Sequence, residues 1–299
     1  MFALAILIGV YSYIIFALGL LGLLYREIIL SVTFIYLLVG LFLARKELDV
    51  YRLRDKIVNF VKRTPKLGLV LFSLIFVQFL INLIGALGPE LGFDALWYHL
   101  TLPKIYLINH SIDYISGGLF YYSAMPKLTE MLYVVGIAFG SETLAKLIHF
   151  SFGILCLVAI YKVSRKFLSK NFSLLASVLL YSNLVVGWMS ITAYVDLART
   201  FFEIMALWGF FKWLESKKYV WIIESAVLLG LAISTKLLAI GSLLIFSVLV
   251  IYFFWTRKKN FSHLFIGLFI YWLTALLVPL PWFIFSHINT GNPVYPFFS

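Results

Sequence analysis

Long hydrophobic stretches separated by short polar connections run through most of this chain. They lie at residues 2–25, 28–44, 67–87, 143–161, 172–190, 197–214, 219–235, 237–255 and 261–285. Each has about the length, roughly 20 residues, that an α-helix needs to cross the hydrocarbon core of a bilayer. The pattern predicts an all-α polytopic membrane protein, because a helix satisfies its backbone polar groups within its own segment.

The connections between these runs alternate in basic charge. Those at 45–66, 162–170, 212–218 and 257–259 hold eighteen of the 24 lysines and arginines. By the positive-inside rule these connections and the N-terminus are cytoplasmic. The others, including 88–142, are then extracytoplasmic, and we expect a site there, away from cytosolic nucleotides.

The composition excludes other classes of protein. Of the 299 residues, 63% are hydrophobic and only 12% are charged, which no soluble domain of this size matches. The net charge of +11 is explained by the cytoplasmic loops, so we expect membrane lipids and no nucleic acid as partners. Motifs for phosphate loops, zinc proteases and hydrolase elbows are absent, and the single Cys156 forms no internal disulfide.

Three regions follow from the pattern. Residues 1–44 form an N-terminal transmembrane hairpin, and 67–299 form a module of seven spans. Between them, 45–66 is basic with apolar residues at helical spacing, which indicates either an amphipathic helix on the cytoplasmic surface or a solvated linker helix. The sequence ends in an aromatic, proline-rich loop without a closing helix, so we expect a longer natural protein or a fragment.

The outer loop 88–142 is the one long connection. It divides at Gly117 and Gly118 into two expected short helices, 95–110 and 126–139. If 126–139 crossed the membrane, the basic stretch 162–166 would lie outside. We therefore expect both helices to lie along the outer interface without spanning.

Asp94 is the first candidate for chemistry, at the start of the first of these helices. It could be a plain N-cap, with Phe93 and Tyr98 as its hydrophobic staple. Tyr98 and His99 crowd the same helix end, however, and a second acid, Glu90, lies four residues earlier. A catalytic role and a capping role both stay open.

A second group of ionisable residues lies in the later spans. Asp196, Arg199 and Glu203 share one helix face, as an ion network or as a site, because intramembrane charges are often functional. Lys236 either marks a helix end or supplies a cation for a phosphate. Lys104 and Lys127 are similar candidates, and His287 is either a polar interface residue or part of the site.

Five stretches, in their order and sidedness, resemble one family. They are GFDALWYHLTLPKIY, the block from Pro126 through FGSETLAKLIHFSFGILCLVAIYKVSRKF, AYVDLARTFFEIMAL, GLAISTKLLAIG and PLPWFIFSHINTGNPVYPFF. Together they resemble the GT-C superfamily of membrane glycosyltransferases, in the branch of the protein O-mannosyltransferases and bacterial aminoarabinose transferases. The resemblance covers about 67–299 and implies a GT-C-type seven-helix module with two interfacial helices in its first outer loop.

The resemblance implies a reaction and a set of roles. A polyprenyl-phosphate sugar is the donor, a glycan, lipid or protein is the acceptor, and the active site faces outward from the plasma (inner) membrane. Asp94 and Asp196 are the implied catalytic aspartates, and Asp94 is the general base. Tyr98, His99, Lys127, Arg199, Lys236 and His287 are expected to bind substrate. Direct displacement implies inversion, and use of a divalent metal, Mg²⁺ or Mn²⁺, stays open.

Two other functions compete with this one. A transporter or flippase of lipid-linked sugars would also place polar groups in a bundle, but the sequence has no inverted repeat. A non-catalytic scaffold with the same fold would keep its function after loss of Asp94.

The charge pattern predicts the sidedness directly. Cysteines introduced at Asn59 and at Gly118 should react with a membrane-impermeant thiol reagent from opposite sides of sealed vesicles. Labelling of both from one side would remove the argument that Asp94 and Asp196 share a compartment.

Overall fold

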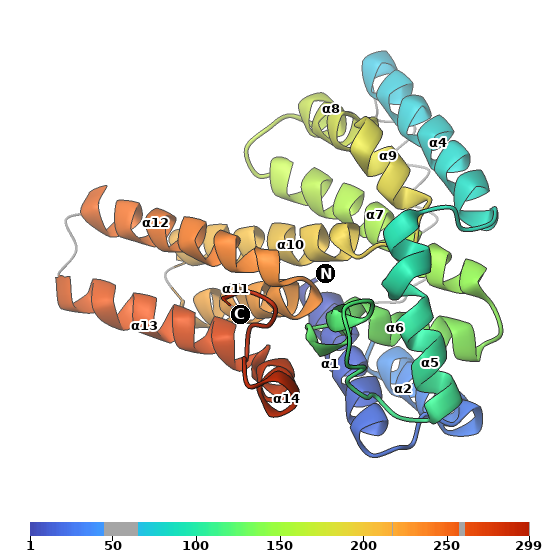
Figure 1. Ribbon diagram of the computed structural model, residues 1–299. Helices are drawn as coiled ribbons and strands as arrows, with labels where there is room; N and C mark the ends of the chain where they lie inside the picture. Colours follow the sequence, from blue (N-terminus) through green and yellow to red (C-terminus); the bar gives the residue numbers. More distant parts are fainter. Residues whose placement is uncertain (45–64, 217, 257–260, 299) are drawn as a thin grey trace. The chain divides into compact units, whose positions relative to one another are not determined.

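A computed structural model describes residues 1–44, 65–216, 218–256 and 261–298 of the protein. This part of the chain contains thirteen α-helices and no β-strand, which confirms the all-α prediction (Figure 1). The helices are α1 (Phe2–Leu20), α2 (Arg26–Ala44), α4 (Lys66–Leu87), α5 (Thr101–Asn109), α6 (Leu128–Ala138), α7 (Glu142–Ser164), α8 (Lys170–Tyr181), α9 (Leu184–Ser190), α10 (Asp196–Ser216), α11 (Tyr219–Thr235), α12 (Ile240–Thr256), α13 (Phe261–Leu277) and α14 (Leu280–Thr290). Three short turns complete them: η1 (Ala95–His99), η2 (Tyr121–Ala124) and η3 (Leu237–Ala239).

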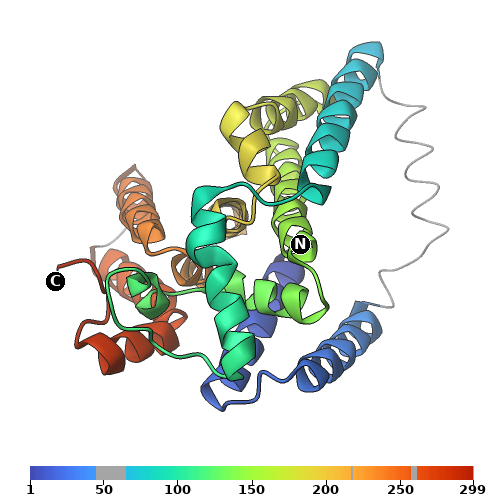
Figure 2. The same ribbon diagram turned by 45° about the vertical axis from the view of Figure 1, so that its right-hand side comes forward.

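The predicted hydrophobic runs all become helical, but two of them break. The run at 172–190 is α8 and α9, bent by 69°, where Asn183 accepts a hydrogen bond from the Val185 amide and starts a new helix (Figures 1 and 2). The run at 261–285 is α13 and α14, bent by 59° next to Pro279. The sequence pattern predicted these segments as single helices, which was wrong at both breaks.

The apolar helices differ in how well they suit a bilayer. Among the described residues, α1, α4 and α7 are each long and apolar enough to cross a membrane, and there are up to five such spans if each bent pair is one. Helices α6 and α11 are apolar but shorter. The protein is therefore an all-α polytopic membrane protein.

The outer loop contains the two expected short helices. The first is the turn η1 followed by α5, and the second is α6. Helix α5 has nine residues and α6 has eleven. Both are shorter than the roughly 20 residues needed to span. Of the predicted basic segment 45–66, residues 45–64 lie outside the described part. The division into regions 1–44, 45–66 and 67–299 stays a prediction.

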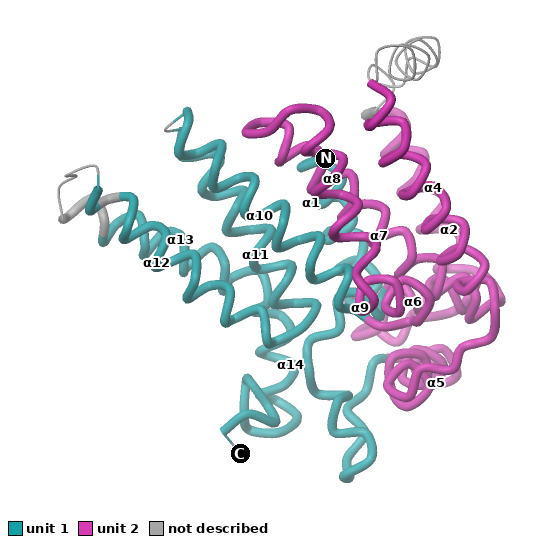
Figure 3. The backbone as a smooth tube through the Cα atoms, turned by 90° about the horizontal axis from the view of Figure 1, so that it is seen from above, with its two compact units in different colours: residues 1–16, 112–131, 195–299 teal, residues 17–111, 132–194 magenta. Residues whose placement is uncertain are grey.

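The chain folds as two compact units (Figure 3). Unit 1 comprises residues 1–16, 112–131 and 195–299, and unit 2 comprises residues 17–111 and 132–194. Helix α1 thus begins in unit 1 and ends in unit 2.

Unit 2 is built around α4, which packs against α7, α8 and α9. Leu71 and Ile75 of α4 are buried with Leu174 of α8, and Leu157 of α7 packs against them. Such interdigitated apolar side chains hold neighbouring membrane helices by van der Waals contact.

Unit 1 is built around the pair α10 and α11, with α13 against α11. Small residues allow close approach: Gly209 of α10 lies on the backbone of Ser225, whose hydroxyl donates to the Ala206 carbonyl at 2.7 Å. This is the packing typical of membrane helices, where small residues bring backbones together and hydroxyls bond across helices.

The first residues of α1 belong to the same unit. Gly9 lies against Leu231 of α11, and the Tyr13 hydroxyl lies 2.8 Å from that of Ser234. The ring of Phe16 stacks on Trp282 of α14, with centroids 3.8 Å apart. The N-terminal helix is therefore packed against the later spans over its first 16 residues.

Gly230 has a contact as close as any of these, part of it with backbone, and gives a test of the packing. A Cβ there would come within 2.5 Å of the Val278 side chain and 2.7 Å of the Ala275 carbonyl oxygen. We expect Gly230→Ala to lower the free energy of unfolding by about 1–3 kcal/mol through overpacking. A thermal melt of the protein in detergent measures it.

The matched control is Gly241→Ala in α12, where a Cβ would meet nothing within 4 Å. Both changes gain the same helix propensity, so their difference reports the packing alone. Equal melting temperatures for the two variants would contradict the packing of α11 on α13.

Candidate active site

The helix around Asp94 begins earlier than the sequence indicates. Helical winding starts at Phe93, and Asp94 has helical dihedrals, φ −65° and ψ −32°, with no side-chain capping bond. The alternative that Asp94 serves as a plain N-cap is therefore wrong, because a capping residue needs non-helical dihedrals. Phe93 is exposed and packs edge to face on Trp97.

A π-helical turn, η1, follows Asp94 directly. The Leu100 amide donates to the Ala95 carbonyl at 2.9 Å, five residues back, and such wide turns often occur at functional sites. The Tyr98 hydroxyl donates to Asp94 Oδ2 at 3.4 Å. The half-buried carboxylate thus has a phenol beside it, one turn further along the helix.

Tyr98 and His99 are both buried next to this carboxylate. Their ring centroids lie 4.1 Å apart, and the His99 ring lies 5.7 Å from that of Tyr194. Unit 2 therefore brings together three of the predicted residues, Asp94, Tyr98 and His99, with an aromatic wall behind them.

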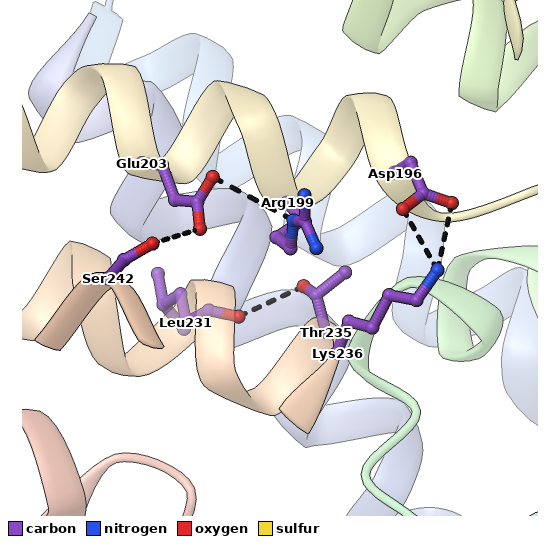
Figure 4. Close-up of polar contacts among 7 residues, drawn as sticks. All are labelled: Asp196, Arg199, Glu203, Leu231, Thr235, Lys236 and Ser242. Carbon is purple, nitrogen blue, oxygen red and sulfur yellow. Dashed lines mark hydrogen bonds and ion pairs between the residues drawn. The ribbon is translucent and has the colours of Figure 1, made fainter. Parts of the chain in front are cut away.

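Unit 1 contains a second polar centre, at the outer end of the α10–α11 pair as the charge pattern predicts it. Asp196 is the first residue of α10, and Lys236 follows the last residue of α11. The Lys236 ammonium donates to both Asp196 carboxylate oxygens, at 2.9 and 3.1 Å (Figure 4). The Asp196 side chain is 21% exposed and the Lys236 side chain is 30% exposed, so the pair is partly open at a helix end.

Arg199 lies one turn deeper along α10, between the Asp196–Lys236 pair and Glu203 (Figure 4). Its Nε is 3.7 Å from Glu203 Oε2, and the Ser242 hydroxyl donates to Glu203 Oε1 at 2.7 Å. The predicted face of three charges is present, but the ion partner of Asp196 comes from α11. Ser242 was missed by the sequence analysis, although a serine in an apolar helix is the kind of signal that marks a partner for a buried acid.

Lys127 is almost completely buried, just before α6. Its ammonium donates to the carbonyls of Tyr122 and, at 2.8 Å, of Met125. Burial lowers the pKa of Lys127 to about 7, with the charge of Glu130 opposing the shift. The side chain therefore holds the turn 121–127 together.

The two remaining candidates lie at the surface of their units. His287 is exposed in α14, and its Nδ1 lies 3.0 Å from the Gly291 carbonyl at the helix end. Lys104 of α5 forms an ion pair with Glu142 of α7, 2.6 Å apart. Neither is packed with the other predicted residues of its unit.

Each unit thus contains one group of ionisable side chains, and each group can be considered by itself. A half-exposed carboxylate takes a proton, and a held ammonium stabilises an anion. Within the described residues no three His, Cys, Asp or Glu side chains form a group suited to a metal ion. Both oxygens of Asp196 accept hydrogen bonds from Lys236.

The fold and these centres define a polytopic helical membrane protein with ionisable groups gathered at helix ends. The family model described as dolichyl-phosphate-mannose-protein mannosyltransferase matches residues 121–285, more than half of the chain. The protein belongs to this family, and it is a membrane glycosyltransferase of the GT-C type. This confirms the resemblance read from the sequence. No curated protein and no solved structure matches the chain.

The family match covers the polar centre of unit 1 and does not cover that of unit 2. Asp196, Arg199 and Lys236 lie inside residues 121–285, whereas Asp94, Tyr98 and His99 precede them and His287 follows. The roles of all these residues stay predictions.

Proposed function

We propose that this protein transfers a sugar from a polyprenyl-phosphate donor to a hydroxyl or amine acceptor on the extracytoplasmic side of the plasma (inner) membrane, with inversion. The observation that carries the proposal is the family match, since the family is described by a lipid-phosphate sugar as donor. The charge pattern supports the sidedness through the positive-inside rule. A lipid-phosphate donor suits that side, because nucleotide sugars are confined to the cytosol.

Asp94 is the base in this proposal. Its carboxylate takes the proton of the acceptor O–H or N–H while the acceptor atom bonds to the anomeric carbon. The bond from that carbon to the phosphate oxygen breaks, and its electron pair leaves with the polyprenyl phosphate. Support comes from the geometry: Asp94 is half-exposed, is not used as a cap, and accepts from Tyr98.

Lys236 and Arg199 stabilise the charge that develops on the phosphate. Asp196 holds the Lys236 ammonium through both oxygens, which fixes the cation before the donor arrives. Glu203 lies 3.7 Å from the Arg199 Nε, one turn deeper, in a looser ion pair. A pre-positioned cation gains more from a developing anion than a mobile lysine does, because no reorganisation is needed during the reaction.

The other predicted residues have supporting roles. Tyr98 orients the Asp94 carboxylate, and His99 forms the wall of the sugar site. Lys127 acts through the turn 121–127, because its ammonium is buried on two carbonyls. The exposed His287 contacts the acceptor.

Replacement of Asp94 by asparagine tests the function. Asp94→Asn keeps the size and hydrogen-bonding oxygen of the side chain and removes the carboxylate base. We expect a folded protein in nanodiscs whose transfer from dolichyl-phosphate mannose, or another polyprenyl-phosphate sugar, falls by roughly 10²–10⁴-fold. Asp113→Asn, at an exposed acid of the same outer loop, is the matched control and should transfer normally. A folded Asp94→Asn protein with the wild-type rate would sink the assignment.

The phosphate role of Lys236 needs a variant that does not leave a lone charge. Lys236→Met alone leaves Asp196 without its ammonium, so the double variant Asp196→Asn with Lys236→Met keeps the site neutral. We expect this folded double variant to bind the lipid-phosphate donor at least tenfold more weakly, while Lys236→Arg keeps part of the affinity through its charge.

The exposed Lys166 provides the control, as Lys166→Met, in a basic connection predicted to be cytoplasmic. Equal donor affinity in the double variant and the wild type, measured by titration in nanodiscs, would return Lys236 to a structural role.

A further inference from the structure

Glu90 uses its whole carboxylate to hold backbone amides. Its Oε1 accepts from the amides of Leu91 and Gly92, at 2.8 and 2.7 Å. Its Oε2 accepts from the amide of Ala193, at 2.7 Å and about a hundred residues further along the chain. One side chain therefore ties together two segments of unit 2, the end of the 88–92 loop and the segment before α10.

Each end of this tie is fixed separately. The Lys146 ammonium donates to the carbonyls of Gly85, Gly88 and Pro89, at 3.1, 2.8 and 2.9 Å. These are the last carbonyls of α4 and the first of the loop, which a cation at a helix C-terminus satisfies. The carbonyls of the loop thus accept hydrogen bonds from Lys146, and its amides donate hydrogen bonds to Glu90.

The segment 192–194 is held at three consecutive residues. His149 of α7 lies with its Nδ1 2.8 Å from the Thr192 carbonyl, Glu90 takes the Ala193 amide, and the Tyr133 hydroxyl of α6 donates to the Tyr194 carbonyl. All three backbone residues are buried. A segment held on every residue keeps one conformation.

Both segments lead directly into the proposed catalytic acids. Asp94 follows Gly92 by two residues, and Asp196 follows Tyr194 by two. We propose that Glu90 is a positioning residue for the transfer reaction, which fixes the chain entering Asp94 on the buried segment 192–194 of the same unit. This inference rests on the proposed function, in which Asp94 is the base.

A carboxylate suits this role and an amide does not. Three N–H groups point at Glu90, and a carboxylate only accepts, whereas a glutamine would turn its own NH₂ group toward a backbone amide. Glu90→Gln is nearly isosteric, so it loosens one end of the tie without opening a cavity. A displacement of about 1 Å in reacting groups lowers rates by up to roughly 10²-fold.

The test compares steady-state kinetics of Glu90→Gln and wild type in nanodiscs, with dolichyl-phosphate mannose as the probe donor and release of the lipid phosphate as the readout. We expect kcat to fall about 10–100-fold while KM for the donor changes less than about threefold. The loss of rate at acidic pH that a carboxylate base produces should remain, because Asp94 is still present.

Three outcomes overturn the inference. An unchanged kcat shows that the tie is not needed, and a change in KM alone assigns Glu90 to donor binding. Loss of the acid limb of the pH profile makes Glu90 itself the base. The control is Glu27→Gln, at an exposed acid of α2 in the same unit, which should leave both constants unchanged.

If Glu90→Gln does not fold, Gly92→Ala decides the question. Its Cβ would lie 3.1 Å from Glu90 Oε1 and 3.2 Å from the Tyr194 ring, so it strains the tie without changing any polar group. The same fall in kcat is expected, and a normal kcat overturns the inference. The two proposals fail separately: an inactive Asp94→Asn with a normal Glu90→Gln removes only the inference. An active Asp94→Asn removes Asp94 as the base, and a wild-type protein that transfers no sugar removes the proposed function.

Discussion

The pairing of Asp196 with Lys236 is the interaction on which the site in unit 1 depends. A charge next to hydrocarbon is expensive unless a partner of opposite sign lies within contact, and a broken pair leaves an uncompensated charge. The partners lie 40 residues apart in sequence, at the start of α10 and just past the end of α11. They meet because α10 and α11 pack along each other, with Gly209 against the backbone of Ser225 several turns away. The packing of α10 on α11 therefore also positions the two charges at the ends of these helices.

The same constraint governs unit 2 in a different form. The chain leaves α4 through a short loop whose backbone groups lack helical partners, and polar groups without partners are costly in a membrane protein. Lys146 takes the carbonyls and Glu90 the amides of that loop. The loop that leads into Asp94 is thus fixed by two side chains of opposite charge, and the proposal that Asp94 is a positioned base requires such preorganisation.

The sequence predicted the helices well because runs of apolar residues and their basic connections report directly on a bilayer. It could not predict the breaks at Asn183 and Pro279, since local breakers act within runs that stay apolar throughout. Capping by Asp94 was a sound local interpretation, but the helix starts one residue earlier and winds into a π turn. Both facts depend on tertiary packing, which a local pattern does not record.

Long-range pairs were also beyond the sequence. The Asp196, Arg199 and Glu203 spacing identified a charged helix face, yet the ion partner of Asp196 and the hydroxyl on Glu203 come from elsewhere in the chain. Glu90 was noted only as a second acid near Asp94, because nothing in its neighbourhood points to Ala193. Residues that work through backbone amides leave no motif, and their partners become known only from the fold.

The proposed function requires that this protein consume a lipid-phosphate sugar. The most direct measurement incubates the purified wild-type protein in nanodiscs with radiolabelled dolichyl-phosphate mannose and related polyprenyl-phosphate sugars, with hydroxyl and amine acceptors. We expect release of the lipid phosphate, with the label on the acceptor in the inverted configuration. Donors that stay intact across the whole panel, or a product of retained configuration, would contradict it.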